Sequence, residues 1–187
     1  MIHQFWAHLL YLYWTLQNSI SRCPGPTPLV IPGPHGEEFP RTYLGYWHFI
    51  AGSAPTPDQL ATFDPVDNIL FHLVPGSTPL ELYLRAAIRM KSGLCVPREW
   101  TYLLAKGTTN LRIQGRPDMK TELFSAPCAE SIILKETGQD FERFLMYSRS
   151  PAPPARCVND FQALVSCWNF TLLQTPRQQG ACVLTSS

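Results

Sequence analysis

Apolar and polar residues alternate along most of the chain between residues 44 and 149. The clearest run covers residues 80–91, where every even position is apolar and most odd positions are polar or charged. Side chains two positions apart share one face of an extended strand, so this run predicts a strand with one buried and one solvated face. Similar segments predict seven more strands, over residues 44–52, 66–74, 96–104, 109–115, 119–124, 131–137 and 141–149.

The pattern changes after a proline-rich turn at residues 151–154. Apolar residues then recur at helical spacing, which predicts a helix beginning near Pro154 with Val158, Phe161, Leu164, Val165 and Trp168 on one side. Short links between the strands favour antiparallel neighbours. We therefore predict an all-β fold, an eight-stranded antiparallel up-and-down barrel with a C-terminal α-helix, whose interior can hold one small ligand. A β-sandwich is the structural alternative.

The connection between the first two predicted strands, residues 54–65, is rich in proline. At about a dozen residues it is long enough to be a functional lid. Pro55 and Pro57 are equally compatible with a loop that is merely stiffened.

The first twenty-one residues contain no Lys, Arg, Asp or Glu. Their apolar core is shorter than the roughly 20 residues that a membrane-spanning helix needs. It fits the apolar region of a secretory signal, and Ser19-Ile20-Ser21 offers small residues for cleavage after Ser21. The core also holds residues that favour lipid interfaces, namely Trp6, Tyr11, Tyr13 and Trp14. The sequence therefore predicts an apolar segment over residues 1–21, either cleaved or retained as an anchor in a lipid surface, followed by one domain over residues 22–187.

Composition excludes some function classes. Charged residues make up 16% of the chain, against about 25% in an average soluble protein, and the net charge is +1. Because there is no basic surplus, we expect no nucleic-acid partner. No serine–histidine–acid arrangement and no phosphate-binding glycine loop stands out, so we expect no catalytic residues and no cofactor.

Six cysteines are scattered along the chain, at positions 23, 95, 128, 157, 167 and 182. Their spacing does not match a zinc site, so we expect no metal. An even number of scattered cysteines indicates three disulfides and an oxidising compartment. Six cysteines allow 15 pairings, among which composition does not choose.

The candidate chemistry lies on the strand over residues 96–104, where Arg98, Trp100 and Tyr102 share a face. In a barrel this face would point inward, because its other residues are apolar. A buried cation needs a partner, and that partner could be an anionic ligand. Glu136, Arg143 and Tyr147 are in phase with apolar neighbours on their own strands, so we expect them in the same interior, with Arg116 near one rim. The simpler interpretation of Glu136 and Arg143 is a self-contained ion pair.

The sequence Leu44-Gly45-Tyr46-Trp47 opens the first predicted strand, and Arg149 follows the last one. Together with eight strands and a helix, these residues resemble the lipocalin family. The resemblance implies structural roles for Gly45, Trp47 and Arg149, with Trp47 closing the barrel floor and Arg149 lying across it. The usual lipocalin motif between the sixth and seventh strands is replaced by Ser125-Ala126-Pro127-Cys128, which indicates an atypical branch.

Three stretches, residues 61–69, 93–98 and 115–124, resemble a lipocalin branch that is carried on plasma lipoproteins. That resemblance implies a secreted carrier on high-density lipoprotein, anchored by an uncleaved signal segment. It implies sphingosine-1-phosphate as the main ligand, with fatty acids as secondary ligands. It also implies the disulfides Cys23–Cys167, Cys95–Cys182 and Cys128–Cys157.

The same resemblance implies a ligand site made of Arg98, Trp100, Tyr102, Arg116, Glu136, Arg143 and Tyr147. By chemistry, the two arginines at 98 and 116 suit a phosphate, because a guanidinium offers several donors in a fixed fork. The Glu136 carboxylate suits an ammonium. Burial of a lipid tail would supply about 0.8 kcal/mol per methylene, so the tail provides much of the affinity and the head group the selectivity.

Two other functions remain open on the sequence alone. One is a lipocalin-type enzyme, which would need a free cysteine as nucleophile. The other is a protein that docks to lipoproteins through residues 1–21 without carrying cargo. A glycosylation site found in some relatives is replaced by Lys135, and a candidate site occurs instead at Asn169-Phe170-Thr171.

Overall fold

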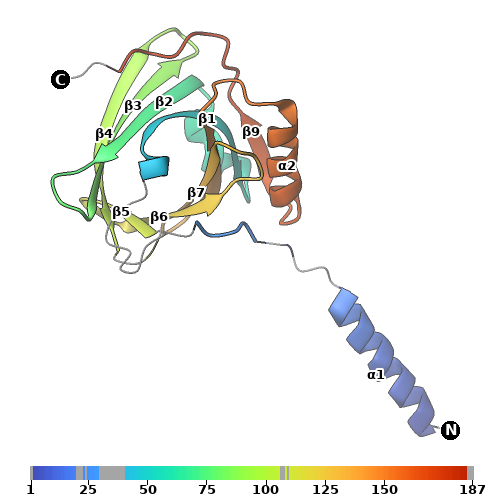
Figure 1. The fold of residues 1–187 in the computed structure, drawn as a ribbon. Coiled ribbons are helices and arrows are strands. Elements are labelled where there is room, and N and C mark those ends of the chain that lie inside the picture. The colour runs from blue at the N-terminus through green and yellow to red at the C-terminus, as the bar shows by residue number, and fades with distance from the viewer. Residues whose placement is uncertain are drawn as a thin grey trace.

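The computed structural model describes residues 2–19, 23, 25–29, 41–105, 108 and 110–184. Eight antiparallel strands form a closed barrel, which Figure 1 shows with one helix against its wall and another apart from it. The strands are β1 Gly45–Ala54, β2 Val66–Pro75, β3 Glu81–Met90, β4 Cys95–Leu104, β5 Asn110–Ile113, β6 Arg116–Ser125, β7 Ser131–Thr137 and β8 Glu142–Ser148. The predicted barrel is confirmed, and the β-sandwich alternative is wrong.

Each strand pairs with its sequence neighbour, and β1 closes the barrel by pairing with both β2 and β8. The β1–β2 pairing is confined to the first half of β1, from Gly45 to His48. The second half of β1, from Ala51 to Ala54, pairs instead with a ninth strand that the sequence did not predict, β9 Thr171–Gln174. The seam between β1 and β2 therefore opens toward one end of the barrel.

Two hydrophobic clusters lie on opposite sides of the barrel wall. The inner one fills the barrel with residues such as Trp47, Phe49 and Phe71. The outer one lies beneath the predicted helix, α2 Ala155–Ser166, and combines Phe161 and Val165 with strand residues such as Ile133 and Met146. A β-bulge between Phe49 and Ala51 places Ile50 and Ala51 together in the outer cluster, which gives α2 a continuous apolar surface.

The closed end of the barrel is built around Trp47 and Arg149. The Arg149 guanidinium lies 3.7 Å from the centre of the Trp47 ring and donates hydrogen bonds to the carbonyl oxygens of Thr42, Leu44 and Tyr46 at 2.6–2.7 Å. The Trp47 indole N–H donates to the carbonyl of Tyr43 in a short helix, η1 Arg41–Tyr43. Gly45 has a φ of 94°, and a Cβ there would lie 3.3 Å from Arg149, so this position favours glycine on both counts.

The N-terminal segment forms a helix, α1 Ile2–Ser19, because residues 1–21 contain neither proline nor glycine. Its described side chains are mostly exposed apolar and aromatic residues, including Trp6, Tyr11 and Trp14, each at least 60% exposed. Among the residues described, no helix has the length and apolar character needed to cross a membrane. Ser21, the predicted cleavage position, lies outside the described residues.

Three disulfides connect the barrel to its flanking segments. Cys23 pairs with Cys167 after α2, and Cys128 pairs with Cys157 at the start of α2. The third, Cys95–Cys182, ties the C-terminal segment to the start of β4. These are the pairs that the family resemblance implies, and all six cysteines are engaged in them. No thiol is left for the cysteine nucleophile that the enzyme hypothesis requires.

Candidate functional site

A cavity of about 210 Å³ lies inside the barrel, between the closed end and the opposite end, which we call the mouth. The turns between β3 and β4, β5 and β6, and β7 and β8 surround the mouth, together with a short helix, η2 Pro57–Phe63. The cavity walls are mostly apolar. Its lining residues are Thr62, Phe63, Val66, Ile69, Phe71, Leu84, Ala86, Ile88, Trp100, Tyr102, Leu134, Glu136, Arg143, Leu145 and Tyr147.

Five of the seven predicted ligand residues line this one cavity: Trp100, Tyr102, Glu136, Arg143 and Tyr147. They come from β4 and from the consecutive strands β7 and β8, which lie about 30 residues further along the chain. β4 supplies Trp100 and Tyr102, which meet edge-on, and β7 and β8 supply the others. Strand alternation places all five on the inner face, because each is opposite another inward residue across the sheet.

Glu136 and Arg143 form an ion pair in the cavity wall. The Arg143 Nε donates to Glu136 Oε2 at 2.6 Å, and the two side chains are only 17% and 11% exposed, respectively. The two residues are cross-strand partners close to the β7–β8 turn. Arg143 also lies over the rings of Phe63 and Phe141, at 5.1 and 5.2 Å. The pair stands near the mouth, where a ligand's polar end would lie if its tail filled the apolar interior.

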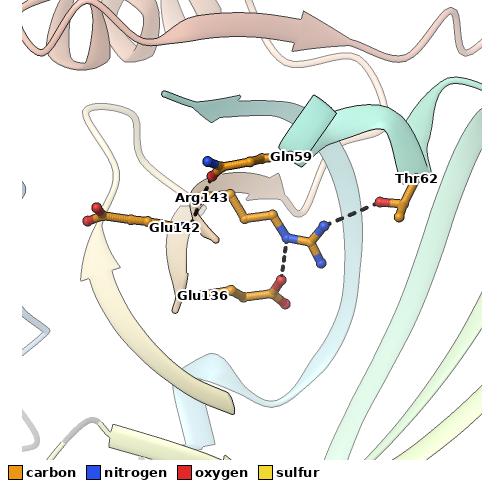
Figure 2. A network of polar contacts seen from close by, with 5 residues as sticks. All are labelled: Gln59, Thr62, Glu136, Glu142 and Arg143. Atoms are coloured by element: carbon orange, nitrogen blue, oxygen red, sulfur yellow. Dashed lines mark hydrogen bonds and ion pairs between the residues drawn. The ribbon is translucent and has the colours of Figure 1, made fainter. Parts of the chain in front are cut away.

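η2 covers the mouth and is fastened to β8 by two polar contacts, which Figure 2 displays. The Glu142 backbone N–H donates to Gln59 Oε1 at 3.0 Å, and Arg143 Nη1 donates to Thr62 Oγ1 at 3.3 Å. Leu60 and Phe63 of η2 are buried, and Phe63 stacks on Phe49 with 4.7 Å between ring centres. The proline-rich connection is thus a short helix whose apolar side closes over the cavity.

Thr62 and Phe63 line the cavity but were not among the predicted site residues. A weak signal for them exists in the sequence. Leu60 and Phe63 are three residues apart after Pro57, which is the spacing of one face of a short helix that begins with proline.

Arg98 and Arg116 do not line the cavity, and both are exposed. The expectation that Arg98 shares the barrel interior is therefore wrong. Its register position, opposite Ala86, does face inward, but β4 pairs with β5 only from Tyr102 onward. The start of β4 projects past β5, and Arg98 stands on this projecting part, where its Nη1 donates to the Pro97 carbonyl. Arg116 stands on the same end of the barrel, at the start of β6 beside the β5–β6 turn.

Burial raises the pKa of both Tyr102 and Tyr147, and the nearby Glu136 carboxylate raises them further. Both hydroxyls are therefore neutral hydrogen-bonding groups at physiological pH. The Trp100 N–H is close enough to Tyr102 to lower that pKa slightly, but it makes no hydrogen bond of good geometry with the described residues and is buried. The cavity thus contains a buried donor whose hydrogen bond is available to a ligand.

Asn169, the candidate glycosylation residue, lies in the turn between α2 and β9. It is exposed and has a φ of 59°. The turn lies on the outer wall, away from the cavity-lining residues.

The comparisons with known proteins agree on one family. The sequence pattern of the ApoM domain matches residues 1–186. Apolipoprotein M of rat is 57% identical and that of mouse 56% identical, each over 189 residues that cover the whole of both chains.

Among solved structures, similarity extends to more distant lipocalins. Lipocalin 12 from rat epididymis superposes with a TM-score of 0.64 at 11% identity, covering 83% of this chain and 91% of its own. The siderocalin Ex-FABP superposes with a TM-score of 0.62 at 18% identity, covering 76% of this chain and 99% of its own. These two likenesses support the barrel fold.

Proposed function

Because this chain belongs to the apolipoprotein M family, we propose that it is a secreted carrier that holds a phosphorylated lipid in the barrel cavity. The preferred cargo in this proposal is sphingosine-1-phosphate, and long-chain fatty acids are secondary ligands. α1 serves as the anchor in the surface of high-density lipoprotein, so residues 1–21 are retained in the mature protein. The domain over residues 22–187 carries the cargo.

The observation that carries the proposal is the polar end of an otherwise apolar cavity. Glu136 and Arg143 form a nearly buried pair there, beside the buried Trp100 N–H. A cavity for a purely apolar ligand has no use for these groups, because burying charges costs free energy even when they are paired. A head group with both an ammonium and a phosphate complements them: the ammonium suits Glu136, and the phosphate suits arginines.

Arg98 and Arg116 extend this polar region outward. Both project from the mouth end of the barrel, and both are exposed, so a head group that reaches past Arg143 would meet them. In this arrangement the phosphate lies at the mouth and the tail lies among Phe71, Leu84 and Leu145. Burial of about twelve methylenes would contribute roughly 10 kcal/mol before losses in freedom of motion.

The cavity volume requires the lid to move when a long-chain lipid binds. About 210 Å³ is below the 300–1,000 Å³ that is usual for pockets holding drug-sized ligands. Phe63 of η2 occupies part of the interior against Phe49. η2 is held at the mouth by one hydrogen bond each from Gln59 and Thr62 and by the buried side chains of Leu60 and Phe63. Exposing the two apolar side chains would cost about 1.5–3 kcal/mol each, which is less than the gain from burying the tail.

The test compares two lipids that differ only in the phosphate. In the full chain, stripped of lipid, the double substitution Arg98→Ala and Arg116→Ala should weaken sphingosine-1-phosphate by about tenfold per arginine and leave sphingosine nearly unchanged. Arg112→Ala is the matched control, since Arg112 is exposed on β5 near the same rim but donates to the Pro117 carbonyl. Equal losses for both lipids would refute the head-group assignment. Failure of every lipid to bind would favour the docking protein without cargo.

A further inference from the structure

The outer wall of the barrel carries an aromatic cluster that the lipid cavity does not use. Trp168 stacks on Phe144 with 5.4 Å between ring centres, and Phe170 lies 5.9 Å from Trp168. Lys135 stands at the edge, with its Nζ 5.5 Å from the centre of the Phe144 ring and 2.6 Å from Glu142 Oε1. We call Lys135, Phe144, Trp168 and Phe170 the aromatic face. A groove of about 380 Å³ runs along it, bounded by Gly25 and Pro26 on one side.

A covalent bond limits the distance between the aromatic face and the end of the N-terminal helix. Cys167 immediately precedes Trp168 and is joined to Cys23. Only four Cα–Cα steps separate Cys23 from Ser19, the last residue of α1. At 3.8 Å per step, the end of α1 stays within about 15 Å of Cys23 in any conformation of the connection. Whatever surface α1 enters is therefore brought close to the aromatic face.

The chemistry of the two regions is alike. α1 exposes Trp6, Tyr11, Tyr13 and Trp14, which favour the head-group layer of a lipid surface. The aromatic face offers a tryptophan and a phenylalanine, both half-buried, beside a lysine whose stem can lie along apolar surface while its ammonium stays among head groups. We propose that the aromatic face is a second contact with the phospholipid surface that α1 enters, so that the barrel lies on the lipoprotein instead of swinging freely from its anchor. This inference rests on the anchor role proposed above for α1.

The candidate glycosylation site at Asn169 provides a separate test of the proposal. Asn169 stands between Trp168 and Phe170 and is exposed. A glycan there would hold bulky, hydrated sugar against the lipid surface. Lipid contact and glycosylation at this turn exclude each other, so mass spectrometry of the secreted protein that finds Asn169 occupied would overturn the proposal.

The direct experiment uses tryptophan fluorescence of the full chain on phosphatidylcholine vesicles with brominated acyl chains, which quench nearby indoles. The background is the double variant Trp6→Phe and Trp14→Phe, which leaves Trp47, Trp100 and Trp168. Quenching should persist in this background and disappear when Trp168→Phe is added. It should persist when Trp100→Phe is added instead, which excludes lipid in the cavity as the source. The proposal is refuted if quenching survives Trp168→Phe, or if the Trp6→Phe, Trp14→Phe background shows no quenching at all. The second result is also expected if α1 itself fills the groove and keeps lipid away from Trp168.

The single variant Trp168→Phe, which keeps Trp6 and Trp14, reports quenching of the anchor, and the double variant reports quenching of Trp168, so the two together separate this inference from the proposed anchor. If Trp6 and Trp14 are quenched and Trp168 is not, the anchor stands and the aromatic face does not. If Trp168 is quenched and Trp6 and Trp14 are not, the anchor fails and the face stands.

A charge substitution gives an independent measurement. Trp168→Glu should weaken partitioning of the full chain onto the vesicles by about tenfold. The matched control is Leu103→Glu. Leu103 is an apolar residue that is 38% exposed, but it lies on β4, which is not among the strands beneath α2. If Trp168→Glu fails to fold, Phe170→Ser tests the same edge with a smaller change. Equal effects of the Trp168 and Leu103 substitutions would overturn the proposal.

Discussion

An arginine stands at each end of the barrel, and the two differ in what accepts their hydrogen bonds. Arg149 at the closed end donates to three backbone carbonyls and covers Trp47. Arg143 at the mouth donates to the Glu136 carboxylate and to the Thr62 hydroxyl of η2. The three carbonyls belong to the backbone from η1 to the start of β1, so Arg149 cannot exchange them for a ligand without unfolding that segment, whereas Arg143 can exchange the carboxylate and the lid hydroxyl for a ligand. An arginine therefore stabilises the fold at the closed end, whereas the arginine at the mouth can exchange its side-chain partners for a ligand.

The largest effect expected from this difference concerns the two inner tryptophans. Trp47→Ala should lower the free energy of unfolding by about 3–5 kcal/mol, because the ring is fully packed and Arg149 loses its support. Trp100→Ala, at the mouth, should cost less than about 2 kcal/mol, because its ring is only partly buried, but should weaken lipid binding. Urea unfolding and lipid titration of both variants measure the contrast. A mouth variant that is as unstable as the closed-end variant would remove the distinction between the ends.

A smaller effect is expected at the ion pair. Glu136→Gln leaves the nearly buried Arg143 without its carboxylate, which should cost about 1–3 kcal/mol of stability. Lipids with an ammonium should bind more weakly, and fatty acids, whose carboxylate Glu136 repels, should bind at least as well. Glu142→Gln is the matched control, since the Lys135–Glu142 pair has the same 2.6 Å separation but is more exposed and should contribute at most about 1 kcal/mol. Chemical denaturation with lipid titration distinguishes the two, and similar results for both variants would contradict the mouth assignment.

The smallest effect near neutral pH concerns the tyrosines between the two ends. Burial, and then Glu136, raises the pKa of Tyr102 and Tyr147 above the ordinary value of 10. A raised folded-state pKa contributes stability that is complete below pH 10 and is lost as the pH rises above it, by about 1.4 kcal/mol per pH unit for each tyrosine. Tyr102→Phe should therefore flatten the alkaline fall of the unfolding free energy. The exposed Tyr46→Phe serves as the control, and an unchanged slope in Tyr102→Phe would show that burial is not the cause.

The sequence predicted the barrel because apolar and polar residues alternate along most of its strands, as in residues 80–91. Alternation tells which face a side chain occupies, but not how far along the barrel axis it lies. Arg98 is the example: its inward phase was predicted, but its exposure depends on β4 projecting past β5, which is a property of strand stagger. Glu136 and Arg143 were predicted in the interior from their phase alone, and the structure adds that they are cross-strand partners near the β7–β8 turn.

The alternation that predicted the barrel strands gave no information on β9 and η2. β9 has only four residues, Thr171–Gln174, too few to establish a period, and it exists because β1 offers a free edge above its pairing with β2. The helical state of residues 57–63 depends on tertiary packing, with Leu60 and Phe63 buried in the mouth. In both cases the local structure depends on tertiary contacts, with the free edge of β1 for β9 and with the apolar mouth for residues 57–63.

The Cys23–Cys167 bond has a consequence for how the protein matures in the cell. Its two cysteines are separated by 144 residues and enclose every strand from β1 to β8, whereas Cys128 and Cys157 are only 29 residues apart. Closing a longer loop costs more conformational entropy, so we expect the Cys128–Cys157 bond to form early and the Cys23–Cys167 bond to form after β8 has paired with β1. In this order, the Cys23–Cys167 disulfide forms after the barrel has closed. The same step tethers the end of α1 to the segment that follows α2, within about 15 Å of Cys23, so the link between the N-terminal helix and this side of the barrel is made only after the barrel has closed.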